Sequence, residues 1–407
     1  MAIDPAHVPQ VHLRSVKRHP LLFRKMVGRV DAAARAGDVV AVFTPQGELF
    51  GYGLYNPRAE IAVRMLQFGD APPGEEFWQA KLETAVALRR ELLQLDAITD
   101  AYRLIHAEAD GLSGLVVDRL GDVLSAEVFS LAMFQRSQAI LERLSRLVGT
   151  RHTLVQVAPQ AHGQEGFLAE AAPSTGLPGE VVVQEYGTRF RVRFAGGHKT
   201  GFFCDQRENR RRLAEFSAGR SVLDLCCYSG GFGIQAKRLG GAGEVTAVDL
   251  DEAAIALARD NARLNQAQIQ FVHADAFGYM RDMIQNRRQY DVVVLDPPKL
   301  IKSRRDVEDG TRKHLDLNRL AFQLVKPGGL LLTCCCSGLL GEPEFLRLLH
   351  TAARQAATAG AGSGPAPAAF VNREVQILAR TGAASDHPVG MHCPETEYLK
   401  AAWVRVG

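Results

Sequence analysis

The chain has 407 residues, of which 46% are hydrophobic and 23% are charged, and its formal net charge at pH 7 is +3. These proportions are typical of a globular protein and exclude collagen, a coiled coil or disorder as a description of the whole chain. At roughly 150 residues per domain, the length suggests two or three domains. The mildly basic balance permits a nucleic-acid partner without requiring one.

Signals for export, membrane insertion and metal binding are missing from the pattern. The first ten residues contain no apolar segment like that of a secretory signal, and no stretch reaches the ~20 apolar residues of a membrane helix. The seven cysteines are odd in number and have no CxxC spacing, so neither a disulfide framework nor a zinc finger is expected. We therefore expect a reduced cytoplasmic protein with no metal site and no membrane partner.

Residues 8–72 are predicted to form a small all-β domain. Apolar or alternating runs at 27–30, 39–44 and 49–55 are separated by turn signals, and another strand is expected at 61–68. Near its start the domain carries six basic residues with no acid among them: Arg14, Lys17, Arg18, Arg24, Lys25 and Arg29. Such a run forms either a solvated face or a phosphate-binding surface, and the sequence leaves both open.

Residues 76–194 are predicted to form an α+β region, which begins after the breaker cluster around Pro72. Helical periodicity is expected over 76–95 and again over 133–148, with a turn-rich pair of strands over 106–128 between them. The segment 181–194 is predicted to be a β-hairpin that turns at Tyr186-Gly187-Thr188.

From about residue 220 the chain alternates between strands and helices. Five short apolar runs, SVLDL, EVTAVD, IQFVH, DVVVLD and LLLTC, are mostly separated by helical segments, which predicts a parallel sheet with helices on both faces. VNREVQILAR and YLKAAWVRV are expected to close the sheet as an antiparallel pair. Residues 353–369 are rich in Ala, Gly and Pro and are predicted to form a surface loop. The fold class is therefore α/β, Rossmann-like, behind two smaller domains.

A nucleoside site is predicted at the carboxyl ends of these strands, where open α/β sheets bind ligands. Asp224 in the first strand is followed by Gly230, Gly231 and Gly233, and the second strand ends at Asp249, which can accept hydrogen bonds from ribose hydroxyls. The glycine spacing is not GxGxxG, so a ligand without a pyrophosphate is favoured. Asp275, after the third strand, is positioned to bind an adenine amine.

This order of elements resembles the class I S-adenosylmethionine (SAM) methyltransferases. Asp296-Pro297-Pro298-Lys299 follows the fourth strand, where that superfamily places its reaction chemistry. The resemblance implies that the proline pair stiffens the loop and aims the Asp296 carboxyl at the target base.

The fifth strand ends in a row of three thiols, Cys334-Cys335-Cys336, followed by Ser337-Gly338. Small buried cysteines are common fillers, and this is the interpretation favoured for Cys334 and Cys335. A thiolate at Cys336 could add to carbon 6 of cytosine and make carbon 5 nucleophilic, which is covalent catalysis. A cation would lower the thiol pKa, and Lys299 and Arg207 are candidates.

Several segments together resemble one family, the ribosomal RNA large subunit methyltransferase I family of bacteria, which makes 5-methylcytosine in 23S rRNA. They are HPLLF, DGLSGLVVDR, GHKTGFFCDQRENRR, DPPK and TCCCSG. The resemblance implies a PUA RNA-binding domain at 8–72, a central RNA-recognition domain at 76–194 and a Rossmann-like catalytic domain at 195–407. It implies SAM as cofactor and 23S rRNA, naked or in a subunit precursor, as partner, and it is compatible with a homodimer.

The same resemblance implies roles for single residues. Cys336 aligns with the catalytic cysteine and Asp296 with the motif acid. The implied SAM contacts are Phe203, Asp205, Gln206, Arg207, Tyr228, Gly230, Asp249, Asp275 and Asp296. The chain departs from the family at His314-Leu315, where an aromatic residue and Lys are usual, at Leu22, where Trp is usual, in the additional cysteines, and in a lengthened 353–369 segment.

Two basic clusters, at 207–220 and 302–313, favour an RNA substrate. Acids lie among the basic residues, so solvated helix faces remain an alternative. The residues expected to contact substrate are Lys299, Arg210, Arg211, Lys302 and Arg304. Two other functions also stay open: methylation of another base atom, such as a guanine amine, with structural thiols, and a non-catalytic rRNA-binding assembly factor.

Overall fold

The computed structural model describes residues 8–194, 200–359 and 374–407. The chain divides into two compact units, each treated separately below. The first contains residues 1–185, 192–205 and 385–396, and the second contains residues 186–191, 206–384 and 397–407. Residues 195–199, which include the start of the GHKTGFFCDQR motif, lie outside the described residues.

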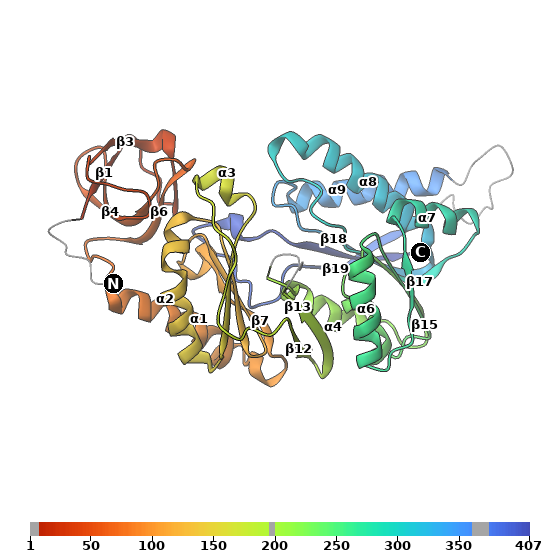
Figure 1. Ribbon diagram of the computed structural model, residues 1–407. Coiled ribbons are helices and arrows are strands. Elements are labelled where there is room, and N and C mark those ends of the chain that lie inside the picture. The colour runs from red at the N-terminus through yellow and green to blue at the C-terminus, as the bar shows by residue number, and fades with distance from the viewer. Residues whose placement is uncertain (1–7, 195–199, 360–373) are drawn as a thin grey trace. The chain divides into compact units, whose positions relative to one another are not determined.

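The first unit begins with a six-stranded sheet in the order β2-β6-β5-β4-β1-β3 (Figure 1). The four strands expected in this region are confirmed, and two further strands, β1 and β2, join them. Alternating side chains of these strands are buried, among them Val11, Leu22 and Val40, and they form the domain core. The strands are β1 (Gln10–Leu13), β2 (Leu21–Phe23), β3 (Val27–Val30), β4 (Val39–Phe43), β5 (Leu49–Tyr55) and β6 (Ile61–Phe68).

A second sheet of the first unit has the order β11-β10-β9-β8-β7 and packs against two long helices. β9 and β10 are parallel, and α2 is the crossover between them. The elements are α1 (Glu75–Ala87), β7 (Ala101–His106), β8 (Leu115–Leu120), β9 (Val123–Val128), α2 (Leu131–Val148), β10 (His152–Val157), α3 (Ala161–Glu165) and β11 (Ala172–Pro173).

Helix α2 shows why the predicted helix forms where it does. The hydroxyl of Ser130 accepts a hydrogen bond from the backbone N–H of Met133, which caps the first turn. Apolar side chains at helical spacing, including Ile140 and Leu144, are buried in a core that also contains Leu54 of β5. The six-stranded sheet and the α+β region of the first unit therefore share one hydrophobic core.

The expected hairpin is confirmed as β12 (Glu180–Glu185) and β13 (Thr188–Arg193). Tyr186 and Gly187 have φ angles of 47° and 74°, the pattern of a two-residue turn with both φ values positive. Such turns match the twist of the flanking strands.

The second unit contains a seven-stranded sheet in the order β16-β15-β14-β17-β18-β20-β19. The first five strands in this order are parallel, and β20 and β19 close the sheet as the expected antiparallel pair. The strands are β14 (Ser221–Leu225), β15 (Glu244–Asp249), β16 (Gln270–His273), β17 (Tyr290–Leu295), β18 (Val325–Cys335), β19 (Val375–Thr381) and β20 (Lys400–Val406).

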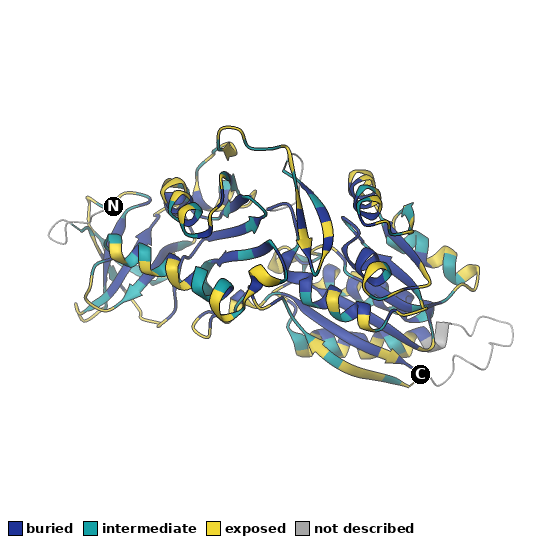
Figure 2. Cartoon of the chain, turned by 90° about the horizontal axis from the view of Figure 1, so that it is seen from below, coloured by how far each residue is buried: buried dark blue, intermediate teal, exposed yellow. Residues whose placement is uncertain are grey.

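Helices cover both faces of this sheet (Figure 1). Helices α4, α5 and α6 pack on one face, and α7, α8 and α9 pack on the other. Figure 2 shows that the strands between them are largely buried while the helices turn exposed residues outward. The helices are α4 (Arg207–Glu215), α5 (Gly231–Arg238), α6 (Glu252–Leu264), α7 (Ala276–Gln285), α8 (Val307–Leu324) and α9 (Glu342–Ala359).

The expectation of a surface loop at 353–369 is wrong for its first part. Helix α9 continues through Ala359, because the alanines in this stretch are strong helix formers. Residues 360–369 lie outside the described residues. Of the helices in the described ranges, none has both the length and the apolar character that crossing a membrane requires.

Candidate active site

The carboxyl ends of the parallel strands gather the chemically active side chains at one edge of the sheet. Asp249 ends β15, Asp296 directly follows β17, and Cys336 directly follows β18. Parallel strands direct their carboxyl ends to the same edge, where open α/β sheets bind their ligands. The backbone N–H of Asp296 donates to the carbonyl of Leu225 at 3.4 Å, which joins the Asp296 segment to the end of the neighbouring strand β14.

The loop between β14 and α5 has an unusual backbone. Cys226, Tyr228 and Gly230 have φ angles of 61°, 46° and 81°, so two non-glycine residues occupy the left-handed region. A Cβ atom on Gly231 would lie 2.8 Å from the side chain of Arg210, so a larger residue here would have to displace that side chain. Strained backbone of this kind is concentrated at functional sites, and this loop is the one predicted to bind the nucleoside.

Backbone donors fix the carboxylate of Asp249. The N–H of Tyr228 donates to its Oδ2 at 2.8 Å, and the N–H of Asp251 donates to its Oδ1 at 2.9 Å. Each oxygen keeps a further lone pair for a ribose hydroxyl. The next residue, Leu250, is apolar yet 66% exposed, so a ligand at the predicted ribose site could contact its side chain.

Asp224 is a further acid at this edge, and the sequence assigned it no contact with a ligand. Its side chain is 0% exposed, and its Oδ2 accepts a hydrogen bond from the N–H of Gly233 at 2.9 Å. Its Oδ1 has no partner among the described residues. Burial raises the pKa of Asp224 to about 7. A buried carboxylate oxygen without a partner can accept a hydrogen bond from a ligand that carries a positive charge.

A chain of buried hydrogen bonds holds the side chain of Asp296. The amide of Gln206 donates to Asp296 Oδ2 at 3.0 Å, and Asn209 donates to Gln206 Oε1 at 2.7 Å. Thr381 donates to Asn209 Oδ1 at 2.7 Å, and the indole of Trp403 donates to Thr381 at 2.9 Å. Gln206 was expected at the cofactor, and the structure gives its amide a direct contact with the reaction-site acid.

The three adjacent cysteines are not equivalent. Cys334 and Cys335 are 0% exposed and belong to hydrophobic cores on opposite faces of the sheet, and burial raises the pKa of both thiols. Cys336 is only partly buried. Their positions agree with the expectation that Cys334 and Cys335 are fillers, and they leave Cys336 as the accessible thiol of the row.

His314 belongs to helix α8 and contacts the second cysteine of this row. Its Nε2 is 3.5 Å from the sulfur of Cys335, its residue is 1% exposed, and burial lowers its pKa to about 4. At this position, where the family usually has an aromatic residue, His314 packs in the core of the second unit.

The basic residues of α4 differ from the expectation of one surface cluster. Arg210, predicted to contact substrate, is 4% exposed, and its side chain lies against Gly231 within electrostatic reach of Asp224. Arg210 therefore lies at the glycine loop with little exposed surface, and its contact with a substrate stays a prediction. Arg207 is 0% exposed with an ion pair to Glu208, whereas Arg211 is exposed, pairs with Glu215 and lies over the ring of Tyr186.

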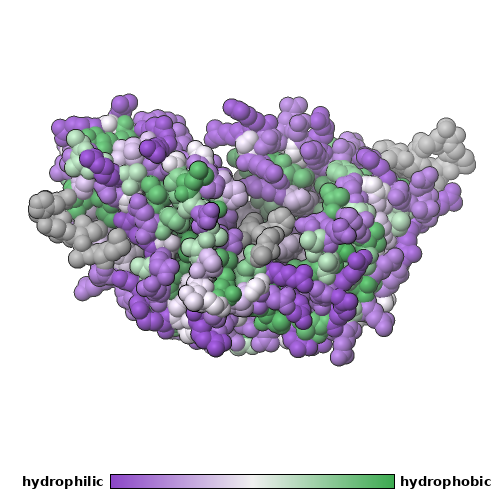
Figure 3. All heavy atoms as spheres, viewed as in Figure 1, coloured by the Kyte–Doolittle hydropathy of each residue, from purple (hydrophilic) through white to green (hydrophobic). Residues whose placement is uncertain are grey.

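Other predicted substrate contacts do lie on the surface. Lys299, Lys302 and Arg304 are exposed, and in the first unit all six basic residues of the N-terminal run are exposed as well. Hydrophilic residues cover most of the face shown in Figure 3, and hydrophobic residues form small separate areas on it. These positions fit contacts with phosphates, which remain predictions.

Three predicted cofactor residues have positions that leave their roles as predictions. Phe203 and Asp205 belong to the first compact unit, while the glycine loop belongs to the second. Asp275 caps helix α7, where its Oδ2 accepts a hydrogen bond from the N–H of Gly278 at 2.9 Å. The helix cap uses only this oxygen of the carboxylate, so it does not require the other one.

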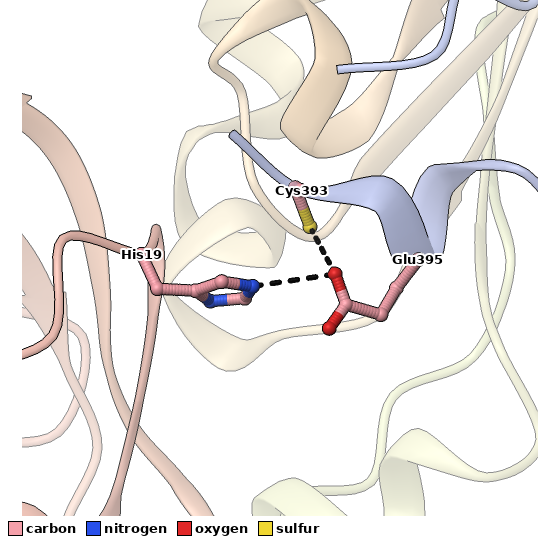
Figure 4. A group of neighbouring side chains, drawn as sticks. All are labelled: His19, Cys393 and Glu395. Atoms are coloured by element: carbon pink, nitrogen blue, oxygen red, sulfur yellow. Dashed lines mark hydrogen bonds and ion pairs between the residues drawn. The ribbon is translucent and has the colours of Figure 1, made fainter. Parts of the chain in front are cut away.

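A separate cluster in the first unit contains His19, Cys393 and Glu395, the types of residue that hold metals (Figure 4). His19 Nε2 and Cys393 Sγ both contact Glu395 Oε2, at 3.2 and 3.4 Å. The N–H of Leu21 donates to His19 Nδ1 at 3.1 Å, which assigns the ring proton to Nε2. Nε2 therefore donates to the carboxylate and offers no lone pair to a metal, so the cluster connects the His19 segment to the 393–395 segment by hydrogen bonds.

Comparisons with known proteins agree with this geometry. The family model of S-adenosylmethionine-dependent methyltransferases matches residues 112–361, and the model of PUA-like domains matches residues 11–68. The chain is 36% identical over 398 residues to a ribosomal RNA large subunit methyltransferase I of Aeromonas hydrophila, with 96% of each chain covered. The chain belongs to the ribosomal RNA large subunit methyltransferase I family. A relative with the same name from Vibrio parahaemolyticus is 33% identical over 395 residues, with 95% of each chain covered.

Solved structures confirm the fold. A methyltransferase complexed with SAH has a TM-score of 0.79 at 19% identity, and a SAM-dependent methyltransferase from Streptococcus mutans has a TM-score of 0.78 at 19% identity. Both alignments cover 98% of this chain and 100% of the other. Membership in the ribosomal RNA large subunit methyltransferase I family makes this chain a SAM-dependent methyltransferase with a PUA-like domain, as the sequence predicted.

The described residues fit the cofactor of this family. Asp249 presents two fixed oxygens for vicinal hydroxyls, and Leu250 presents an exposed apolar side chain beside them. The orphaned, buried Oδ1 of Asp224 suits the ammonium group of the methionine moiety. The glycine spacing of this loop is not the strict GxGxxG, in agreement with a nucleoside ligand.

Proposed function

We propose that this chain methylates carbon 5 of a cytosine in 23S rRNA, with Cys336 as a covalent nucleophile. One observation carries the proposal: of three adjacent thiols, only Cys336 is not fully buried, and it follows the strand next to the one that leads to Asp296. The curated relatives are named for rRNA of the large subunit, which supports the choice of substrate.

The reaction needs a nucleophile because carbon 5 of cytosine is too electron-poor to attack a methyl group unaided. The Cys336 thiolate adds to carbon 6, and the electron pair of the 5,6 double bond moves toward carbon 5 and the ring. Asp296, in its protonated form, donates a hydrogen bond to ring nitrogen 3 and accepts one from the amine, which stabilises the negative charge that develops at nitrogen 3. After carbon 5 has been alkylated, it loses its proton, and the pair left behind expels the thiolate.

SAM, when bound, supplies the methyl group on a sulfonium. We assign its ribose to Asp249, its ammonium group to Asp224 and its close backbone approach to the loop at Tyr228 and Gly230. Gln206 keeps Asp296 oriented through the hydrogen bond of 3.0 Å described above. Asp275, Phe203, Asp205 and Arg207 remain proposed contacts on the strength of the family pattern.

RNA recognition is proposed to use the exposed basic side chains of both units. The PUA-like domain contributes its run of six, and the segment after the Asp296 loop contributes Lys299, Lys302 and Arg304. Contacts of this kind bind phosphates without reading sequence. The three-domain division at 8–72, 76–194 and 195–407 is part of the same proposal.

The test compares Cys336→Ala with Cys334→Ala in cells that lack the gene. Bisulfite sequencing of 23S rRNA should detect one cytosine that is protected with wild type and with Cys334→Ala, and unprotected with Cys336→Ala. Calorimetry should show that Cys336→Ala still binds SAM. Retained methylation in Cys336→Ala, or a different modified nucleoside in the mass spectrum of digested rRNA, would refute the covalent mechanism, and absent SAM binding by the wild type would refute catalysis altogether.

A further inference from the structure

Lys400 is a buried cation next to the row of cysteines. It begins β20, and its Cα partner in the antiparallel register is Cys335 of β18. The residue is 7% exposed, and its Nζ donates a hydrogen bond of 2.6 Å to the carbonyl of Ser337, the residue after Cys336. The sequence alone predicted no role for this lysine.

Within the described ranges, the ammonium group of Lys400 has no close ion pair, although the carboxylate of Glu397 acts on it electrostatically. Its hydrogen bond to Ser337 occupies one of three N–H donors. A buried charge is costly unless it is paired. Burial lowers the pKa of Lys400, and the positive charge of Lys299 acts in the same direction. The nearby thiolates of Cys335 and Cys336 and the carboxylate of Glu397 act in the opposite direction.

The other cations named from the sequence are less well placed for this role. Arg207 forms an ion pair with Glu208, so its charge is already balanced. Lys299 is exposed to solvent, where water screens its field. Lys400 combines burial with an anchored ammonium group, and a charge in such surroundings acts more strongly on a neighbouring thiolate.

We propose that Lys400 is a positioning residue that anchors the Cys336–Gly338 turn and stabilises the Cys336 thiolate electrostatically. This inference rests on the proposed nucleophilic role of Cys336. The hydrogen bond to Ser337 fixes the backbone that carries the sulfur, and the positive charge favours release of the thiol proton to solvent. Cys335 is no competing nucleophile, because it is 0% exposed and packs against His314.

The test measures the thiol itself, without RNA. Full-length wild type, Lys400→Met and Lys400→Arg are alkylated with iodoacetamide from pH 6 to 10, and fragmentation mass spectrometry assigns the label to Cys336. An opposite charge within about 4–6 Å lowers a pKa by about 1 unit or more. If Lys400 acts on the thiolate in this way, Lys400→Met should react about 10-fold more slowly at pH 7. Lys400→Arg should keep most of the reactivity, because it keeps the charge.

Lys326→Met is the matched control, since Lys326 lies at the other end of β18 and pairs with Asp291. It should leave the Cys336 profile unchanged. Lys400→Gln provides a second neutral variant if Lys400→Met does not fold, and circular dichroism establishes folding of each. A Cys336 profile in a folded neutral variant that matches the wild type would overturn the role of Lys400.

The two proposals fail in different ways. If Cys336→Ala still methylates rRNA, the nucleophile assignment fails, whatever the alkylation profiles show. If Cys336→Ala is inactive but the neutral Lys400 variants keep the wild-type profile, only the inference about Lys400 fails. Methylation by Lys400→Met should fall in parallel with its alkylation rate, and its affinity for SAM should stay within about twofold of wild type.

Discussion

Removing the carboxyl group of Asp224 should change how SAM binding depends on pH. In the free protein, burial raises the pKa of this group to about 7, and its Oδ1 has no partner among the described residues. If the ammonium group of SAM pairs with this oxygen, the bound form holds Asp224 ionised. Binding below pH 7 must then release a proton from Asp224, and Asp224→Asn, which has no proton to release, is the natural comparison.

The size of the effect follows from the pKa. With a value of about 7 in the free protein, Asp224 is about three-quarters protonated at pH 6.5, so binding should release about 0.8 proton. At that pH the α-amino group of SAM is already largely protonated, since such groups titrate near 7.7–8.0, and it contributes little. Titration calorimetry in two buffers of different ionisation enthalpy measures the number directly.

Asp224→Asn should release about 0.8 proton fewer than wild type at pH 6.5 and should bind SAM more weakly. The same pKa predicts a stability effect with a defined sign. The folded state holds the Asp224 proton more tightly than the unfolded state, so this group lowers the stability of the free protein as pH rises from about 4 to 7. Urea unfolding of the free proteins should therefore show that the free energy of unfolding of Asp224→Asn rises relative to that of wild type between about pH 4 and pH 7. Equal proton release by the two proteins would refute the placement of the ammonium group at Asp224.

Two further predictions concern the other parts of the account. Asn209→Leu breaks the hydrogen-bond chain to Asp296 and leaves Gln206 and Thr381 without a buried partner, which should lower the free energy of unfolding by about 1–3 kcal/mol per orphaned group. Its kcat should fall while its affinity for SAM holds, as measured by urea unfolding and steady-state kinetics; a loss of stability with unchanged kcat would contradict the orienting role of the chain. Charge reversal at Lys17 and Arg18, both exposed, should weaken RNA binding and flatten its salt dependence without affecting SAM binding. An unchanged salt slope in filter binding would remove these two residues from the RNA-binding surface.

The strands of the catalytic sheet could be predicted from the sequence because each is a short apolar run bounded by turn signals. The positions of Asp249, Asp296 and Cys336 followed, since each lies where a parallel strand ends. Strand β2, with 3 residues, was missed because so few residues carry no readable periodicity.

Features that depend on long-range packing could not be predicted. Arg210 belongs to a helix rich in arginine and was predicted to contact substrate. Its burial depends on how closely Gly231 of another helix approaches it. Lys400 reaches the cysteine row only through the antiparallel register of β20 on β18, and register is set by the tertiary fold. Asp224 was predicted only as a residue of the first strand, and its unpartnered oxygen is found only once the surrounding atoms are placed.

Trapping the covalent adduct is the sharpest test of Cys336 as a nucleophile. In 23S rRNA transcribed with 5-fluorocytidine, fluorine replaces the hydrogen that carbon 5 must lose, so the thiol cannot be expelled after methyl transfer. If Cys336 is the nucleophile, wild type should form a complex with this RNA that survives denaturing electrophoresis. The mass of the nucleotide should be found on the peptide that contains Cys336. Cys336→Ala should form no such complex. Methyl transfer to normal rRNA together with no trapped complex on the fluorinated RNA would contradict the role of Cys336 as nucleophile.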